Sequence, residues 1–232
     1  KSKKYKKVAT VSSSKKSCVH LNSPLRIKAM RKAINYAFDR EKMVKYFRNN
    51  IGYPAKAGFI PNGLPSYNDS VVKGYSYNPE KVRQLLMEAG FPEGKGLPEI
   101  TLHTTENYLE QTEFIQSQLA ENNIKISISV DKASVLKQAV ASCEYNLFKK
   151  SWVGDYADEE NFMSLFYSKK FAPIGYNYTH YKNPEFDILF EKVIKEQNRA
   201  IKNSLYQQMD KMLIDDAPIV PLYYDQIIRL VN

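Results

Sequence analysis

The chain has 232 residues, of which 43% are hydrophobic and 25% charged, a composition typical of a soluble globular protein large enough for a real core. The net charge of +9 is concentrated in residues 1–16, which hold seven lysines and no acid, whereas residues 17–232 hold 27 basic and 25 acidic side chains. No arginine-rich patch with interleaved aromatics occurs, which argues against nucleic-acid binding, and no run approaches the roughly 18 apolar residues of a membrane-spanning helix.

The first fifty residues predict two short strands and two helices. Residues 6–12 and 17–21 are β-rich runs separated by a Ser/Lys turn. Ser23-Pro24 favours the start of a helix, because serine caps the free N–H groups and proline lacks one. Asp39 is expected to cap a second helix over 40–48. Apolar residues at helical spacing mark the inner faces: Ala29, Met30, Ala33, Ile34 and Ala37 in the first helix, and Met43, Val44 and Phe47 in the second.

Residues 51–78 contain seven glycines and prolines and predict a long loop, a length typical of functional segments. A regular alternation of helices and strands follows. The expected elements are a helix over 78–90, a strand over 99–104, a helix over 106–122, a strand over 124–130, a helix carrying Val135, Leu136, Ala139 and Val140 on one face, and a strand over 145–151. This β-α-β-α-β order predicts parallel strands joined by right-handed crossovers.

The remaining residues predict three further helices and two closing strands. The expected elements are a helix over 159–166, a Tyr/Gly loop over 168–180, a helix opening at Asn183-Pro184, a helix over 198–215, and strands over 219–224 and 227–231. No repeat or linker divides residues 24–217, so we expect one α/β domain. The sequence begins at Lys1 without Met or an apolar leader, as expected for a piece of a longer or processed protein.

The stretch over 151–161 carries the strongest indication of a binding site. It follows the third predicted parallel strand and contains Trp152, the only tryptophan, and Asp155. Ligands of open α/β sheets bind at the carboxyl ends of strands, where a carboxylate and an aromatic wall suit an ammonium group. Lys149 offers a positive charge to a ligand carboxylate. The alternatives are that Trp152 fills the core, that Asp155 and Asp158 cap the next helix, and that Lys149 is a solvated strand lysine.

Several other chemistries lack their motifs. There is no G-x-S-x-G, no P-loop and no G-x-G-x-x-G. Cys18 and Cys143 lie far apart and the three histidines are scattered, so we expect neither a disulfide framework nor a zinc site. Two alternatives stay open: a hydrolase that uses Asp155 and Asp158 as acid and base, and a basic module that binds anionic surfaces through residues 1–16.

Five segments together resemble a known family, the extracytoplasmic solute-binding proteins of peptide and nickel ABC importers. The segments fall in the family's order and cover about residues 18–224. They are Arg31-Lys32-Ala33-Ile34-Asn35-Tyr36-Ala37-Phe38-Asp39-Arg40-Glu41-Lys42; Tyr77-Asn78-Pro79-Glu80-Lys81 with Leu85-Leu86 and Glu88-Ala89-Gly90-Phe91-Pro92; Trp152-x-x-Asp155-Tyr156-x-Asp158; Tyr181-x-Asn183-Pro184-Glu185-Phe186-Asp187; and Pro218-Ile219-Val220-Pro221-Leu222.

The resemblance implies the second lobe of a two-lobed fold of the periplasmic-binding-protein type, with a mixed, mostly parallel sheet flanked by helices. Residues 1–21 would connect to a missing first lobe, 22–217 would form the ligand-binding lobe, and 218–232 would return to the first lobe. The implied protein is extracytoplasmic, either soluble or membrane-anchored. It binds peptides without catalysis, metal or cofactor, and delivers them to a membrane permease.

The resemblance also implies roles for single residues in the ligand site. Asp155 matches the acid that holds a peptide's ammonium group, and Trp152 matches the aromatic that lines the side-chain pocket. Lys149 falls where some members carry a basic residue for a peptide carboxylate. Tyr156 belongs to the same motif, and Asn177 is a candidate pocket residue by its position in the Tyr/Gly loop. Glu159 departs from the family pattern, in which proline is usual, so the shape of this turn is expected to differ.

Overall fold

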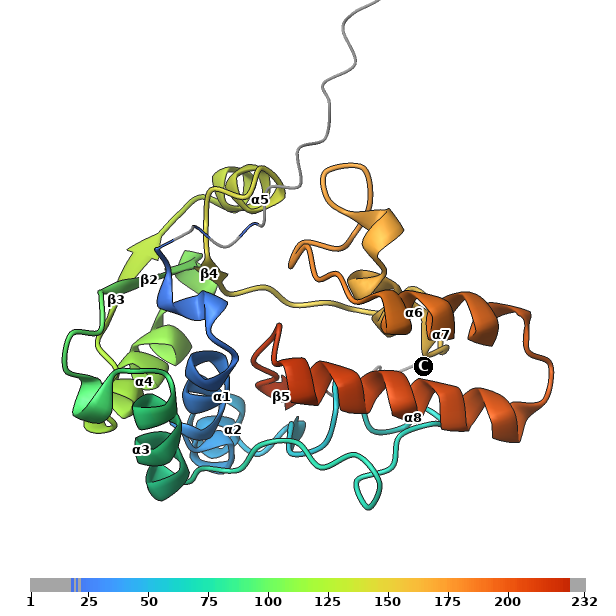
Figure 1. The fold of residues 1–232 in the computed structure, drawn as a ribbon, viewed down its shortest axis with the longest axis horizontal. Coiled ribbons are helices and arrows are strands. Elements are labelled where there is room, and N and C mark those ends of the chain that lie inside the picture. Colours follow the sequence, from blue (N-terminus) through green and yellow to red (C-terminus); the bar gives the residue numbers. More distant parts are fainter. Residues whose placement is uncertain (1–17, 19, 21, 226–232) are drawn as a thin grey trace, which may run out of the picture.

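The structure, a computed structural model, describes residues 18, 20 and 22–225 (Figure 1). Its helices are α1 (Lys28–Tyr36), α2 (Arg40–Arg48), α3 (Pro79–Glu88), α4 (Leu109–Glu121), α5 (Ala133–Ala141), α6 (Glu160–Met163), α7 (Pro184–Lys195) and α8 (Arg199–Asp216). Its strands are β1 (Tyr53–Pro54), β2 (Ile100–Thr104), β3 (Ile126–Val130), β4 (Leu147–Phe148) and β5 (Tyr223–Tyr224). Short 3-10 turns are η1 (Pro24–Arg26), η2 (Pro92–Gly94), η3 (Glu106–Tyr108), η4 (Ser164–Phe166) and η5 (Ser168–Lys170).

The central sheet is parallel, with strand order β3-β2-β4. The crossover from β2 to β3 carries α4, and the crossover from β3 back past β2 to β4 carries α5. Figure 1 shows these two helices on opposite faces of the sheet. This confirms the predicted β-α-β-α-β unit. The strand expected over 145–151 is shorter than predicted: β4 is an edge strand that pairs only with β2, through Leu102–Leu147 and His103–Phe148.

Side-chain caps fix the starts of four of the eight described α-helices, where the sequence predicts them. The Asp39 carboxylate accepts hydrogen bonds from the N–H groups of Glu41 and Lys42. Asparagine side chains cap three further helices, α3, α7 and α8. Ser23 caps only the short turn η1, because Ile27 is extended and α1 begins after it, at Lys28. Val135, expected on the inner face of α5, is instead 47% exposed.

Two large apolar clusters form the interior. The first joins α1, α3 and α4 to strands β2 and β3. The second joins α6, α7 and α8, which lie together away from the sheet in Figure 1, and it includes Ile60 of the long loop. The predicted loop over 51–78 is confirmed except for the two residues of β1. The connection from β4 to α6, which carries Trp152, therefore runs from one cluster to the other.

Residues 218–225 return to the beginning of the described chain. Arg40, which is 2% exposed, donates to the carbonyl oxygen of Pro221 at 2.7 Å, and Asn35 donates to that of Ile219 at 3.1 Å. The strand expected over 219–224 is reduced to β5, which pairs antiparallel with β1. The strands expected over 6–12 and 227–231 lie outside the described residues, as does most of that over 17–21.

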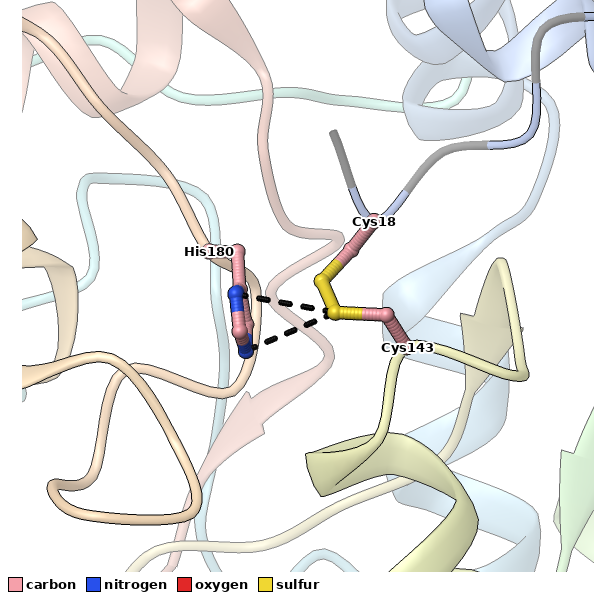
Figure 2. Close-up of side chains that lie close together, drawn as sticks. All are labelled: Cys18, Cys143 and His180. Atoms are coloured by element: carbon pink, nitrogen blue, oxygen red, sulfur yellow. Dashed lines mark hydrogen bonds between the residues drawn. A yellow bond between two sulfur atoms is a disulfide. The ribbon is translucent and has the colours of Figure 1, made fainter. Parts of the chain in front are cut away.

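The two cysteines form a disulfide, so the expectation of no disulfide is wrong (Figure 2). Cys18 and Cys143 are 125 residues apart, yet their Cα atoms are 4.6 Å apart. The segment after α5 lies beside the segment before η1, where the N–H of His20 also donates to the Asn146 side chain at 2.9 Å. Separation along the sequence carried no information about this contact, because the fold brings the two segments together.

Candidate functional site

The candidate site lies where the sheet changes winding direction. From β2 the chain crosses to β3 and then returns past β2 to β4, so the carboxyl ends of the neighbouring strands β2 and β4 lie at the edge where open α/β sheets bind ligands. Tyr108 follows β2, and Lys149 and Ser151 follow β4. The hydroxyl oxygens of Tyr108 and Ser151 lie 2.9 Å apart, which joins the two strand ends.

Lys149 is a cation without a counter-ion. Its Nζ lies 4.0 Å from the ring centroid of Tyr108, and no carboxylate forms an ion pair with it in the part of the chain that the structure describes. Burial lowers the pKa of Lys149 to about 8, because the charged form loses solvation. The side chain is therefore mostly protonated at neutral pH and can gain from an anionic ligand.

Trp152 is half-buried at the edge of the second apolar cluster. Its ring lies 5.5 Å from that of Tyr176, which belongs to the loop over 168–180. The indole N–H is buried and has no acceptor among the described residues. The alternative that Trp152 fills the core is therefore met in part, because the ring packs against the second apolar cluster and is only half-buried.

Asp155 and Tyr156 are exposed on the turn that follows Trp152. The Asp155 carboxylate has no hydrogen bond or ion pair within the described ranges, whereas the backbone of the turn is held firmly. The buried Asn161 accepts from the N–H of Asp155 at 3.3 Å and donates to the carbonyl of Tyr156 at 3.2 Å. Sequence reasoning did not assign this role to Asn161, because nothing in its spacing distinguishes a turn-holding amide from a surface one.

Asp158 has the capping role that was the alternative interpretation. Its carboxylate accepts from the N–H of Glu160 at 2.8 Å and from the hydroxyl of Tyr206 at 3.4 Å. A carboxylate used in this way is poorly placed to act as the acid or base of a hydrolase. The neighbouring Glu159 is fully buried and bonds to Arg199.

Asn177 is fully buried, and its amide is saturated within its own loop. The nitrogen donates to the carbonyl oxygens of Tyr167 and Tyr181, and the oxygen accepts from the Thr179 hydroxyl and the Tyr181 N–H. All four of its hydrogen-bonding positions are thus occupied. This placement gives Asn177 the role of organising the loop and leaves it no group for a ligand.

Two hollows in the described part of the chain lie away from the candidate residues. Hollows of about 370 and 630 Å³ lie at the opposite ends of the strands, the first beside Ile100 and the second beside Ile126, and neither is lined by Trp152 or Asp155. Asp155 and Tyr156 are exposed and Lys149 and Trp152 are half-buried, so the candidate site lies at the molecular surface, at the carboxyl edge of the sheet. Tyr108 was missed by sequence reasoning, although the strand-end rule that selected Trp152 applies equally to the residues after β2.

One group of described residues has the composition of a metal site. Cys18, Cys143 and His180 bring possible ligand atoms within 4.8 Å of one another. Figure 2 shows the two sulfurs bonded together beside the imidazole, whose nitrogens both lie 3.6 Å from the Cys143 sulfur. Because thiolates bind metals and disulfide sulfurs are poor ligands, the bridged state does not fit a metal ion.

No helix in the described part of the chain is long and apolar enough to cross a membrane. The family model "Bacterial extracellular solute-binding proteins, family 5 Middle" matches residues 1–173. The glutathione-binding protein GsiB of Pectobacterium atrosepticum is 28% identical over 207 residues, 86% of this chain and 39% of that protein. The heme-binding protein A of Haemophilus influenzae is 30% identical over 199 residues, 83% and 36% of the two chains.

A solved structure shares the fold. It is the ABC transporter-associated periplasmic binding protein DppA of Helicobacter pylori in complex with the peptide STSA, with a TM-score of 0.79 and 27% identity. The match covers 86% of this chain and 39% of the solved one. The chain thus has the α/β fold of periplasmic binding proteins, as predicted, and spans less than half the length of these relatives.

Proposed function

Because the chain belongs to the bacterial extracellular solute-binding proteins of family 5, we propose that it forms the peptide-binding lobe of a receptor that serves an ABC importer. The observation that carries this proposal is two opposite charges, Asp155 and Lys149, which lie on one segment at the carboxyl edge of the sheet and have no ion-pair partner among the described residues. A zwitterionic ligand complements such a pair, since each of its charged ends gains a partner.

The proposed roles follow from the chemistry of a short peptide. Asp155 accepts hydrogen bonds from the peptide ammonium group, and the Lys149 ammonium pairs with a peptide carboxylate. Trp152 provides an apolar wall. Tyr156, exposed beside Asp155, contributes an aromatic rim. Asn177 is left out of the proposed site, because its amide is saturated.

The surface position of the site supports a second proposal, that the ligand is enclosed only when another lobe covers it. Pockets bury most of a ligand's surface, which one exposed edge does not do. In this proposal residues 22–217 form the ligand-binding lobe, and residues 1–21 and 218–232 connect it to the other lobe. The receptor acts outside the cytoplasm, soluble or membrane-anchored, delivers its ligand to a permease, and catalyses no reaction.

Calorimetry on the receptor that contains this chain tests the proposal. Short peptides should bind, and Asp155→Asn should weaken binding by about 2–5 kcal/mol, because it leaves a buried ammonium without its charged partner. N-acetylated peptides should bind weakly to both forms, and Asp155→Asn should then have no further effect. Asp69→Asn, which removes another exposed carboxylate, is the control.

The outcomes separate the site from the ligand class. Tight peptide binding that Asp155→Asn leaves unchanged removes Asp155 from the site. Binding of heme but of neither peptides nor glutathione overturns the proposed ligand class, since heme carries no ammonium group for Asp155. Hydrolysis of a bound peptide would contradict the proposal that the receptor is not an enzyme.

A further inference from the structure

The turn that presents Asp155 ends in an ion pair between a buried carboxylate, Glu159, and the partly exposed Arg199. Glu159 is 0% exposed, and the Arg199 Nη2 lies 2.8 and 3.0 Å from its two carboxylate oxygens. One of these oxygens also accepts from the backbone N–H of Ser66 at 2.8 Å. The Glu159 side chain therefore connects three segments: the turn that carries Asp155, the long loop over 51–78 and the start of α8.

The loop and the helix are joined to one another as well. The side chain of Gln207, on α8, donates to the carbonyl oxygen of Ser66 at 3.1 Å, so both backbone groups of Ser66 are anchored. Arg199 is the first residue of α8, where a positive charge is unfavourable for the helix dipole. Its position is therefore explained by Glu159, and not by the stability of the helix on its own.

We propose that Glu159 is a positioning residue for the ligand site, held by Arg199 and Ser66, and that it fixes the turn carrying Trp152 and Asp155. The path is short. Glu159 precedes the first residue of α6, and Asn161, on the first turn of α6, holds the Asp155 N–H and the Tyr156 carbonyl. The inference rests on the proposed function for its significance, but the geometric part of it is measured without any ligand.

The two partners differ in exposure, which predicts an asymmetry. The Arg199 side chain is 45% exposed, so it can be hydrated when Glu159 loses its charge. Glu159 has no access to water, so removing Arg199 leaves an uncompensated buried carboxylate. Arg199→Gln should therefore lower the unfolding midpoint more than Glu159→Gln does. The double variant Glu159→Gln/Arg199→Gln should regain part of that loss.

Trp152 makes the test direct, because it is the only tryptophan of the chain and lies in the site. In Glu159→Gln, tryptophan emission should shift to longer wavelength and quenching by acrylamide should rise, since the ring becomes more accessible to water. Asp210→Asn is the matched control. Asp210 is also a buried carboxylate and holds the same loop, through the N–H groups of Phe59 and Ile60, but it bonds to no residue of 152–161.

The outcomes discriminate positioning from general loosening. Altered Trp152 emission in Glu159→Gln, with native emission in Asp210→Asn, supports the proposal. Unaltered emission in Glu159→Gln overturns it, and so does an equal change in both variants. If Glu159→Gln does not fold, Arg199→Lys, which keeps the charge at an exposed site, is compared with Asp210→Asn in the same way.

A ligand measurement then separates this inference from the proposed function. In the receptor, Glu159→Gln should weaken peptide binding roughly two- to thirtyfold, the range of coupling through residues that do not touch the ligand. Altered Trp152 emission with unchanged peptide affinity overturns the positioning role. Absence of peptide binding in the unaltered receptor overturns the proposed function and leaves the emission result intact.

Discussion

Removing the Cys18–Cys143 bridge should cost a large share of the stability of the fold. The bridge closes a loop across 125 residues, and the chain-entropy relation for a loop of this length gives about 5 kcal/mol at 25 °C. A domain of this size is stable by only about 5–15 kcal/mol. Denaturant unfolding should therefore show a much lower midpoint in the presence of a reductant and in the variant Cys18→Ser/Cys143→Ser.

The control is the same variant with reductant added, in which no further change is expected. Thiol titration of the folded, untreated protein should find no free cysteine, and the same titration after reduction should find two. An unchanged unfolding midpoint after confirmed reduction would refute the stabilising role of the bridge. Two reactive thiols in the untreated protein would refute the bridge itself.

Two further predictions concern pH. Burial lowers the pKa of Lys149 to about 8, so affinity for a carboxylate ligand, measured by calorimetry on the receptor, should fall as pH rises above about 8. In Lys149→Arg the side chain stays charged, so the affinity should persist over the same pH range. An identical decline in both proteins would exclude Lys149 as the cause. Burial raises the pKa of Asp210 from 3.8 to about 6, so the folded chain keeps a proton that the unfolded chain releases between these values. Relative to Asp210→Asn, the unaltered chain should lose roughly 3 kcal/mol of unfolding free energy as pH rises through that window. Denaturant titrations measure this, and a difference in unfolding free energy between the two proteins that does not change with pH would contradict the raised pKa of Asp210.

Local signals predicted the helices and the parallel strands well, because their causes are local. Asp39 and Asn78 cap their helices through N–H groups two or three residues away, and the sequence displays both partners together. The disulfide and the Glu159–Arg199 pair were not predictable in this way. Their partners are 125 and 40 residues apart, and only the packing of the helices brings them into contact.

The residues of the candidate site also differ in how far the sequence could predict them. Trp152 and Asp155 could be selected because a strand end and a family motif coincide there. Asn177 was selected by position alone, and the structure shows that its polar groups are already occupied by its own loop. The departure at Glu159 was visible in the sequence, but its structural meaning depends on Arg199 and on the backbone N–H of Ser66, which belong to two other segments.

The contact between Arg40 and Pro221 has a consequence for how the chain is made. Residues emerge from the ribosome in order, and the acceptor for this buried guanidinium is synthesised 181 residues after the donor. The first apolar cluster therefore remains without part of its covering, Val220 and Leu222, until almost all of the described chain exists. Contacts of such high sequence separation slow folding. Complete covering of this cluster is therefore expected to be a late step in the folding of the described chain.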